Sequence, residues 1–163
     1  WTGEKVCSER FSRDTLAAIS AAMQRAPVLW DNYPVNDGEK MSRRLNLRPF
    51  CNRPEDMPSW CRGHLANPMN QARLSRIALC TMPGCRSPAT GFEQAVARQA
   101  PPALASVLAR DLGLFNDEGL DAIDKPHQRR LVSEYGTFEH PIATEVLGWL
   151  QGEYRFDPAC LTE

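Results

Sequence analysis

The sequence predicts an α/β protein that is mostly helical by residue count, and three observations support this class. A short apolar segment that turns polar follows a predicted helix almost at once, as in an α/β repeat. Apolar residues at helical spacing dominate the chain after residue 90. A stretch rich in Pro, Gly and Ser, residues 83–90, separates the two parts. We therefore expect an α/β unit over residues 1–84 and a helical bundle over residues 85–163.

The composition is that of an ordinary soluble globular protein. Of the 163 residues, 42% are hydrophobic and 24% are charged, and the formal net charge is -1. This charge balance gives no reason to expect nucleic acid or an anionic membrane as a partner. No apolar run approaches the roughly 18 residues needed to cross a bilayer. The chain begins with Trp1 rather than Met, which favours a piece of a longer protein; a signal peptide is neither visible nor excluded.

The cysteine pattern favours free thiols over disulfides or a metal site. None of the spacings is a CxxC, and the three histidines do not pair with cysteines at zinc-finger spacing. A disulfide is the next alternative, with Cys51 and Cys61 as the first candidate pair because both lie in one irregular stretch. A redox or metal module is the weakest alternative, so no cofactor is expected, and cysteine usage slightly favours the cytoplasm. The six cysteines are Cys7, Cys51, Cys61, Cys80, Cys85 and Cys160.

The first part of the chain is predicted to form the end of one strand, then a helix, then a second strand. Residues 1–6 are expected to end a strand, and Ser12 is expected to cap a helix that runs to about Arg25. Pro27 closes this helix, and a strand follows directly over residues 28–30. The apolar stripe that should face the core consists of Leu16, Ile19 and Met23.

A long irregular stretch, residues 37–63, follows the first strand and is rich in Pro and Arg. Its basic patch is expected to be a solvated rim rather than an anion site. A second short strand is predicted over residues 64–66 and a helix over residues 69–82. The basic patch consists of Arg43, Arg44, Arg48 and Arg53, and the helix should direct Ala72, Leu74, Ile77, Ala78 and Thr81 toward the core.

The last part should form a bundle in which no catalytic constellation is visible. Prolines stand near the expected helix starts, where the missing N–H does no harm. Glu134 with His140, and Asp121 with Asp124, are more typical of surface charges than of sites. The expected helices span residues 92–98, 103–114, 127–135 and 142–154, and the core stripes include Leu104, Val107, Leu108, Leu112, Val146, Leu147 and Leu150.

Polar side chains cluster where the two predicted strands end. Asp31 and Asn32 follow the first strand and Asn67 follows the second, each tip close to a proline. In alternating α/β folds the carboxyl ends of the strands are where active sites sit. The plainer interpretation is an ordinary Asn/Asp turn that leaves the core.

The segment WDNYPVND, residues 30–37, resembles a segment of the family 84 glycoside hydrolases, the β-N-acetylglucosaminidases that include protein O-GlcNAcases and relatives named hyaluronidases. WTGEKVCS, residues 1–8, is similar to the family's WTGPKVVS, with Glu4 and Cys7 as departures. LNLRPF, residues 45–50, is similar to LxLGPY, with Arg48 where glycine is usual. ANPM at residues 66–69 and SRIAL at residues 75–79 complete the resemblance.

The resemblance implies the last part of a (β/α)8 TIM barrel followed by a post-catalytic helical domain. On that model, residues 1–84 supply a trace of the sixth strand, the seventh strand ending at Trp30 and the eighth ending near Ala66. Residues 85–163 form the helical domain. The implied partners are the remaining N-terminal part of the barrel and a glycoprotein or glycan that carries N-acetylglucosamine.

The activity that the resemblance implies is retaining hydrolysis assisted by the substrate's own acetamido group. In this family a neighbouring Asp-Asp pair, upstream of the matching segment, assists the acetamido group and serves as acid and base. No Asp-Asp occurs in this sequence. We therefore expect no catalytic residue within the chain, and no hydrolase activity from the chain alone.

The resemblance assigns this chain a sugar-binding wall made of four residues. Asp37 should accept hydrogen bonds from the sugar's 4- and 6-hydroxyls, and Asn67 should bind the neighbouring hydroxyls. Asn32 should lie near the acetamido group, and Trp30 should form part of an apolar floor. Asp31 is left with a structural role. The alternative function is a non-catalytic sugar-binding or interaction module that kept this wall.

Overall fold

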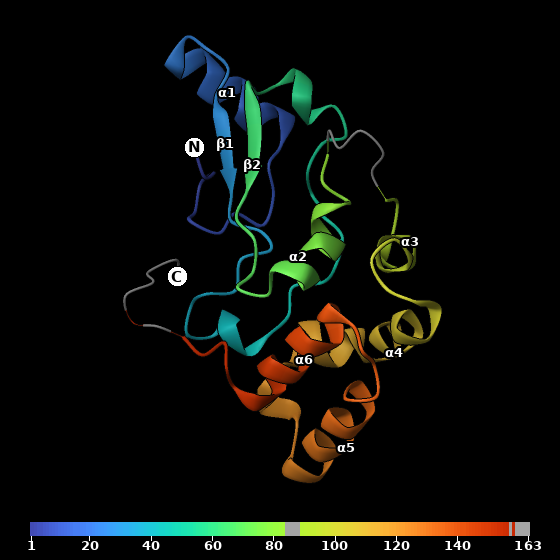
Figure 1. Cartoon of the computed structure of the whole chain (residues 1–163). Helices are drawn as coiled ribbons and strands as arrows, with labels where there is room; N and C mark the ends of the chain where they lie inside the picture. Colours follow the sequence, from blue (N-terminus) through green and yellow to red (C-terminus); the bar gives the residue numbers. More distant parts are fainter. Residues whose placement is uncertain (84–88, 157, 159–163) are drawn as a thin grey trace.

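The computed structural model describes residues 1–83, 89–156 and 158. At one end lies a two-stranded parallel sheet beside helix α1 (Arg13–Met23), and at the other lies a group of helices (Figure 1). Strand β1 (Val28–Asp31) pairs with strand β2 (Gly63–Ala66) in a register that joins Val28 to Gly63 and Asp31 to Ala66. The expected mixture of parallel strands and many helices is confirmed; the described residues do not form a closed barrel.

Helix α1 begins where the sequence predicts. The Ser12 side-chain oxygen accepts a hydrogen bond of 3.1 Å from the backbone N–H of Thr15, which is the N-cap arrangement. The expectation that the whole apolar stripe faces the core is wrong, because Leu16 is buried whereas Ile19 is half-buried and Met23 is 40% exposed. The small core beneath α1 covers only the first turns of the helix and consists of Phe11, Leu16, Leu29 and Met57.

The expected strand tail over residues 1–6 is wrong, since none of these residues forms a strand, although Trp1 bonds to the backbone of β1. The amino group of Trp1 donates to the carbonyl of Val28 at 2.9 Å, and the N–H of Trp30 donates to the carbonyl of Trp1 at 3.0 Å. Strand β2 bonds the other edge of β1, where Asn67 donates to the carbonyl of Asp31. Trp1 is therefore held against the edge of β1 that β2 leaves open.

The long stretch between the strands contains only two 3-10 turns, Met41–Arg43 and Met57–Ser59. Arg43 and Arg48 form exposed ion pairs with Asp121 and Asp117, as expected of a solvated rim. The expectation is wrong for Arg53, whose side chain is 4% exposed. Arg53 is buried because it forms an ion pair with the buried Asp31 carboxylate at the end of β1.

Helix α2 (Ala72–Leu79) is shorter than predicted but buries the expected face. Leu74, Ile77 and Ala78 are buried, and Thr81 is buried just beyond the helix. Ala72 is exposed, contrary to expectation. It stands two residues before Leu74, about 200° around the helix axis, and so points away from the core.

The four predicted helices of the last part are present. They are α3 (Phe92–Ala97), α4 (Pro102–Gly113), α5 (Lys125–Tyr135) and α6 (Pro141–Gln151). Between α4 and α5 the structure adds two turns that the sequence did not predict, a π-helical turn, η3 (Leu114–Glu118), and a 3-10 turn, η4 (Leu120–Ala122). In the described residues, no helix is long and apolar enough to cross a membrane.

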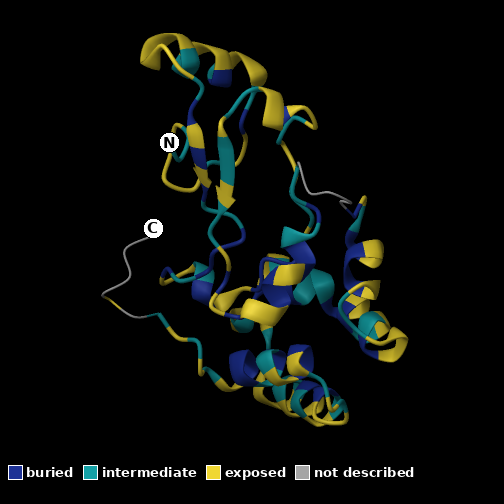
Figure 2. Cartoon of the chain, turned by 45° about the horizontal axis from the view of Figure 1, so that its top comes forward, coloured by how far each residue is buried: buried dark blue, intermediate teal, exposed yellow. Residues whose placement is uncertain are grey.

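The main core joins the bundle to the first part of the chain. Phe115 contacts Trp149 and Tyr135, with ring centroids 5.1 and 5.7 Å apart. Leu45, which follows β1, and Met69, which follows β2, belong to the same core. Buried residues accordingly lie on α2 as well as on the bundle helices (Figure 2). The loops that follow both strands are thereby fixed against the bundle.

Candidate functional site

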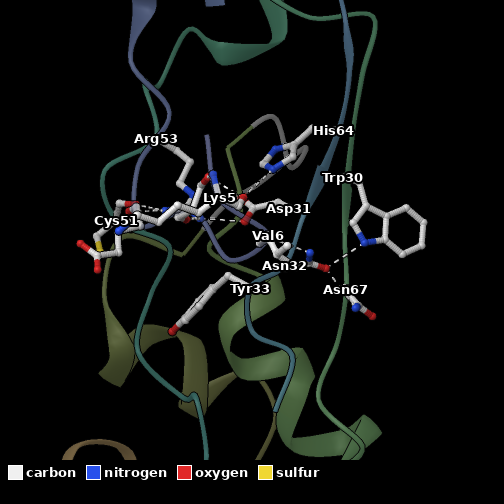
Figure 3. A network of polar contacts seen from close by, with 12 residues as sticks. Lys5, Val6, Trp30, Asp31, Asn32, Tyr33, Cys51, Arg53, His64 and Asn67 are labelled. Atoms are coloured by element: carbon white, nitrogen blue, oxygen red, sulfur yellow. Dashed lines mark hydrogen bonds and ion pairs between the residues drawn. The ribbon is translucent and has the colours of Figure 1, made fainter. Parts of the chain in front are cut away.

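The site begins with a buried ion pair at the carboxyl end of β1. The alternation of β1 turns Asp31 to the buried face, where its side chain is 1% exposed. Arg53 donates from Nη2 to Oδ1 at 2.7 Å and from Nε to Oδ2 at 2.9 Å, the two-pronged geometry of strong arginine–carboxylate pairs. Nε2 of His64, on β2, lies 3.0 Å from Oδ2 (Figure 3). Asp31 therefore pairs with a buried cation, as suits the structural role expected of it. The sequence did not indicate which residue supplies that cation.

The remaining N–H groups of Arg53 bind the backbone of two loops. Nη1 donates to the carbonyls of Glu9 at 2.8 Å and Cys51 at 2.9 Å, and Nη2 donates to that of Ser8 at 3.1 Å. With the two bonds to Asp31, all five donors of the guanidinium are used. The rings of Phe11 and Phe50 lie 5.2 and 5.8 Å from the guanidinium carbon, within the range of cation–π contacts.

The Asp31 carboxyl is held in its charged form. Burial by itself raises the pKa of Asp31, but hydrogen bonds from His64 and Arg53 and the positive charge of Arg53 outweigh it. The pKa therefore lies below the ordinary value of 3.8. Nδ1 of His64 is buried and has no hydrogen-bond partner among the described residues. Nε2 is therefore the ring nitrogen through which His64 contacts the carboxylate.

Asn32 forms hydrogen bonds with two of the other three predicted site residues, Trp30 and Asn67. Its Oδ1 accepts hydrogen bonds from the indole N–H of Trp30 at 2.8 Å and from Nδ2 of Asn67 at 3.1 Å. Its Nδ2 donates to the carbonyl of Val6 at 2.7 Å. Both ends of the carboxamide are thereby oriented, as Figure 3 shows.

A cavity of about 390 Å³ opens beside the carboxyl end of β1, in the size range of small-molecule sites. Asn32 and the half-buried Asp37 line it, whereas Trp30 and Asn67 do not. Trp30 is 48% exposed, because it points to the opposite face of the sheet from Asp31. The other residues that line the cavity are Cys7, Ser8, Glu9, Tyr33, Val35, Gly38, Met41, Asn46, Arg48, Pro49, Cys51, Asn52, Arg53 and Asn116.

Two asparagines that were not predicted as site residues shape the turn that carries Asp37. The side chain of Asn36 is buried, donates to Oε1 of Gln71 at 2.9 Å and accepts from the backbone N–H of Asn70 at 3.1 Å. The side chain of Asn46 donates to the carbonyls of Pro34 and Val35. The turn is therefore fixed from two sides before the chain reaches Asp37.

Tyr33 lines the cavity, and its neutral hydroxyl donates a hydrogen bond within the cavity wall. Its hydroxyl donates to the carbonyl of Arg48 at 2.6 Å. Burial, and to a smaller extent the neighbouring Cys51 thiol, raises the pKa of Tyr33 well above its usual value. The phenol stays protonated at any physiological pH, so this hydrogen bond persists.

The helical part also reaches the cavity, which the sequence did not indicate. The π-helical turn η3 carries Asn116 to the cavity wall, where its Oδ1 accepts from the backbone N–H groups of Leu47 at 2.9 Å and Arg48 at 3.2 Å. A single π-helical turn inserted after an α-helix is frequently found at functional sites. Asn116 thus joins the bundle to the loop that follows β1.

The candidate disulfide between Cys51 and Cys61 does not form, since both residues are free thiols. Cys51 is exposed at the cavity and Cys61 packs beside the small core under α1, so the two thiols serve different surroundings. Cys85 and Cys160 lie outside the described residues. Within the described ranges, no cluster of His, Cys, Asp and Glu could hold a metal ion.

Comparison with known proteins decides the family. A family model described as beta-N-acetylglucosaminidase matches residues 1–101, which is more than half of the chain. The chain belongs to the β-N-acetylglucosaminidase family. The matched residues contain the ion pair of Asp31 and Arg53 and most of the cavity wall. The resemblance of the WDNYPVND segment to the family 84 glycoside hydrolases is thereby confirmed.

Individual relatives agree with the family. The chain is 33% identical over 82 residues to proteins named Protein O-GlcNAcase from Rattus norvegicus and from Mus musculus, covering 50% of this chain and 9% of each relative. A solved structure of a mutant O-GlcNAc hydrolase from Thermobaculum terrenum matches with a TM-score of 0.67 and 25% identity, over 94% of this chain and 41% of that one. The chain therefore spans a minor part of the length of each relative.

Proposed function

We propose that this chain is part of a β-N-acetylglucosaminidase that removes N-acetylglucosamine from glycoproteins or glycans. The reaction is substrate-assisted retaining hydrolysis, and residues 1–84 supply the last part of the catalytic barrel while residues 85–163 form the post-catalytic helical domain. One observation carries the proposal. Asn32 and Asp37 line one cavity at the carboxyl end of β1, inside the residues that match the family.

Asp37 is the residue to which we assign the sugar's outer hydroxyls. A carboxylate offers only acceptors, so it suits two neighbouring hydroxyl donors better than any neutral side chain does. The turn that carries it is fixed by Asn36 and Asn46, so little side-chain or backbone ordering is needed when the sugar arrives.

Asn32, Asn67 and Trp30 form the rest of the proposed wall. The bond from Asn67 to Asn32 and that from the Trp30 indole to Asn32 bring the three side chains to one point of the sheet. Trp30 and Asn67 lie outside the cavity beside β1, on the face of the sheet that we expect the remaining barrel strands to enclose. There the Trp30 ring can act as the apolar floor under the acetamido group.

The reacting carboxylates belong to the rest of the protein. The 163 residues contain no Asp-Asp pair, so the group that orients the acetamido N–H and the general acid/base must come from the N-terminal part of the barrel. The present chain binds and orients the sugar so that its acetamido oxygen can reach the anomeric carbon.

Asp37→Asn in the complete enzyme tests the proposal. A charge-assisted hydrogen bond contributes about 1.5–3 kcal/mol, so we expect kcat/KM for an aryl N-acetylglucosaminide to fall roughly ten- to a hundredfold. Asp14→Asn, on the exposed first turn of α1, is the matched control and should leave kcat/KM unchanged. An unaltered kcat/KM for Asp37→Asn would remove this residue from the site.

The absence of an Asp-Asp pair in this chain keeps a second function in view, a sugar-binding module without hydrolysis. The same complete protein separates the two functions. Turnover of the aryl N-acetylglucosaminide supports the hydrolase, whereas saturable binding of N-acetylglucosamine without turnover supports the module.

A further inference from the structure

We propose that Arg53 is a positioning residue that holds one side of the sugar cavity together. The Arg53 clasp consists of Arg53, the Asp31 carboxylate and the carbonyls of Ser8, Glu9 and Cys51. It joins the loop before α1, the end of β1 and the loop before β2. The inference rests on the proposed function for its effect on substrate, although the clasp itself can be tested without substrate.

All three joined segments reach the cavity. Ser8 and Glu9 come from the first, Asn32 directly follows Asp31, and Cys51 lies with Arg53 in the third. The first and third segments also share a backbone bond, from the N–H of Phe11 to the carbonyl of Asn52 at 3.0 Å. The clasp therefore lies behind the cavity wall rather than at a distant point of the fold.

The geometry of the clasp requires a guanidinium. Five donors lie in one plane, two on a carboxylate and three on carbonyls, while aromatic rings lie near the guanidinium carbon. A lysine ammonium has three donors around one atom and cannot reach both segments and both carboxylate oxygens. Arg53→Lys therefore keeps the charge that neutralises Asp31 and loses part of the connection between segments.

The clasp acts on the sugar through Asn32. The loop before α1 supplies the Val6 carbonyl to which Asn32 donates, and Asp31 is its neighbour on the strand. If this loop moves away, Asn32 loses a partner and its carboxamide can turn. A carboxamide that can turn has to be ordered again when the sugar binds, so a loosened clasp should weaken substrate binding and raise KM.

The first test uses steady-state kinetics of the complete enzyme carrying Arg53→Lys. We expect KM for an aryl N-acetylglucosaminide to rise roughly tenfold or more while kcat changes less than about threefold, because the clasp holds the binding wall and not the reacting carboxylates. Arg13→Lys is the matched control, since Arg13 pairs with Asp56 at an exposed site, and it should change neither constant. An unchanged KM, or a loss confined to kcat, would overturn the role toward substrate.

The second test measures backbone order parameters by NMR on the 163-residue chain, with a mild additive that covers the exposed apolar face of the sheet and keeps the chain dispersed. In the wild type, residues 7–9 and 51–53 should be about as rigid as the bundle helices, with order parameters near 0.85. Arg53→Lys should lower them toward about 0.6 in these two segments while α4, α5 and α6 keep their values. Segments that are already mobile in the wild type would refute the clasp, and this outcome does not depend on whether the variant folds.

The two tests separate the inference from the proposed function. A complete wild-type protein that does not hydrolyse the aryl N-acetylglucosaminide contradicts the function, and the order parameters then still decide the clasp. A wild type that turns over, combined with Arg53→Lys kinetics like those of Arg13→Lys, contradicts the inference alone.

Discussion

At the scale of single residues, the site is built around a buried ion pair, Asp31 with Arg53, and a half-buried amide, Asn32. Desolvation of Asp31 and Arg53 offsets much of their attraction, so such a pair orients its neighbours more than it stabilises the fold. The carboxamide of Asn32 is likewise oriented, through hydrogen bonds with Trp30, Asn67 and the Val6 carbonyl. Removing one member of a buried pair is costly, however, because the other charge stays behind.

Asp31→Asn should therefore destabilise the chain in a pH-dependent way. At pH 7 the free energy of unfolding should fall by about 3 kcal/mol, since Arg53 loses its counter-charge in a buried site. Because the pKa of Asp31 is lowered in the folded state, its stabilising contribution is complete above 3.8 and is lost as pH falls through the folded pKa.

Urea unfolding of wild type and Asp31→Asn at pH 7 and at about pH 2.5 checks this prediction. The difference between the two proteins should shrink at the lower pH, because the stabilising contribution of the Asp31 charge declines as the pH falls below 3.8. A difference of the same size at both pH values would show that the Asp31 charge is not what Arg53 and His64 stabilise.

The sequence led to site assignments for residues that follow a strand, which stay predictions, and it gave no assignment for a buried residue in irregular chain. Asn32 and Asp37 were assigned through the family resemblance, and both line the cavity. Arg53 stands among prolines and other arginines, which is typical of a solvated loop. The one available signal was indirect: a carboxylate at the end of a buried strand requires a cation, but the sequence does not say which arginine supplies it.

At the scale of elements, the π-helical turn η3 links the bundle to the cavity. It ends at Gly119, whose φ of 81° and ψ of -172° form a conformation that is essentially restricted to glycine. A Cβ at this position would lie 2.6 Å from the backbone oxygen of Arg43. Gly119 therefore lets the turn lie against the loop that follows β1, which sets the place of Asn116.

Gly119→Ala should destabilise the chain by about 3 kcal/mol, through backbone strain and the clash with Arg43. Gly113→Ala is the matched control at the end of α4. Its φ is -61° and the nearest atom to an added Cβ is 4.0 Å away, so it should be neutral or stabilising by up to about 1 kcal/mol. Thermal unfolding of both variants measures the contrast, and equal effects would contradict this account.

The elements themselves were largely predictable because α1 begins at a serine cap, α4, α5 and α6 have a proline in their first turn, and the helices carry apolar stripes. The π-helical turn was not, since it uses the same residue types as the α-helix before it. Helix ends were also misplaced, as at α2, where the apolar pattern continues beyond the last helical residue to Thr81.

At the scale of the molecule, the proposed function divides binding and chemistry between two parts of one protein. The main core crosses the expected boundary near residue 84, since Leu45 and Met69 pack with the bundle. The division into a barrel part and a helical domain stays a prediction. The sequence could place this chain in its family because short motifs occur in order, but packing across the boundary depends on contacts that no motif encodes.

The 163-residue chain alone should not turn over an aryl N-acetylglucosaminide, because it has no Asp-Asp pair to assist the acetamido group. A sensitive fluorogenic assay at high protein concentration checks this. The complete enzyme serves as the positive control, and activity in the short chain that survives repurification would contradict the proposed division.

The open face of the sheet has a consequence for the colloidal behaviour of the chain. Val28, Trp30 and Leu65 are 50%, 48% and 52% exposed, and Trp30 stands opposite Leu65 in the register. Among the described residues, no strand pairs with the outer edge of β2. An apolar face beside an unpaired edge is a template for intermolecular strand pairing. Purified alone, the chain should therefore associate as its concentration rises, and mild additives that cover apolar surface should keep it dispersed.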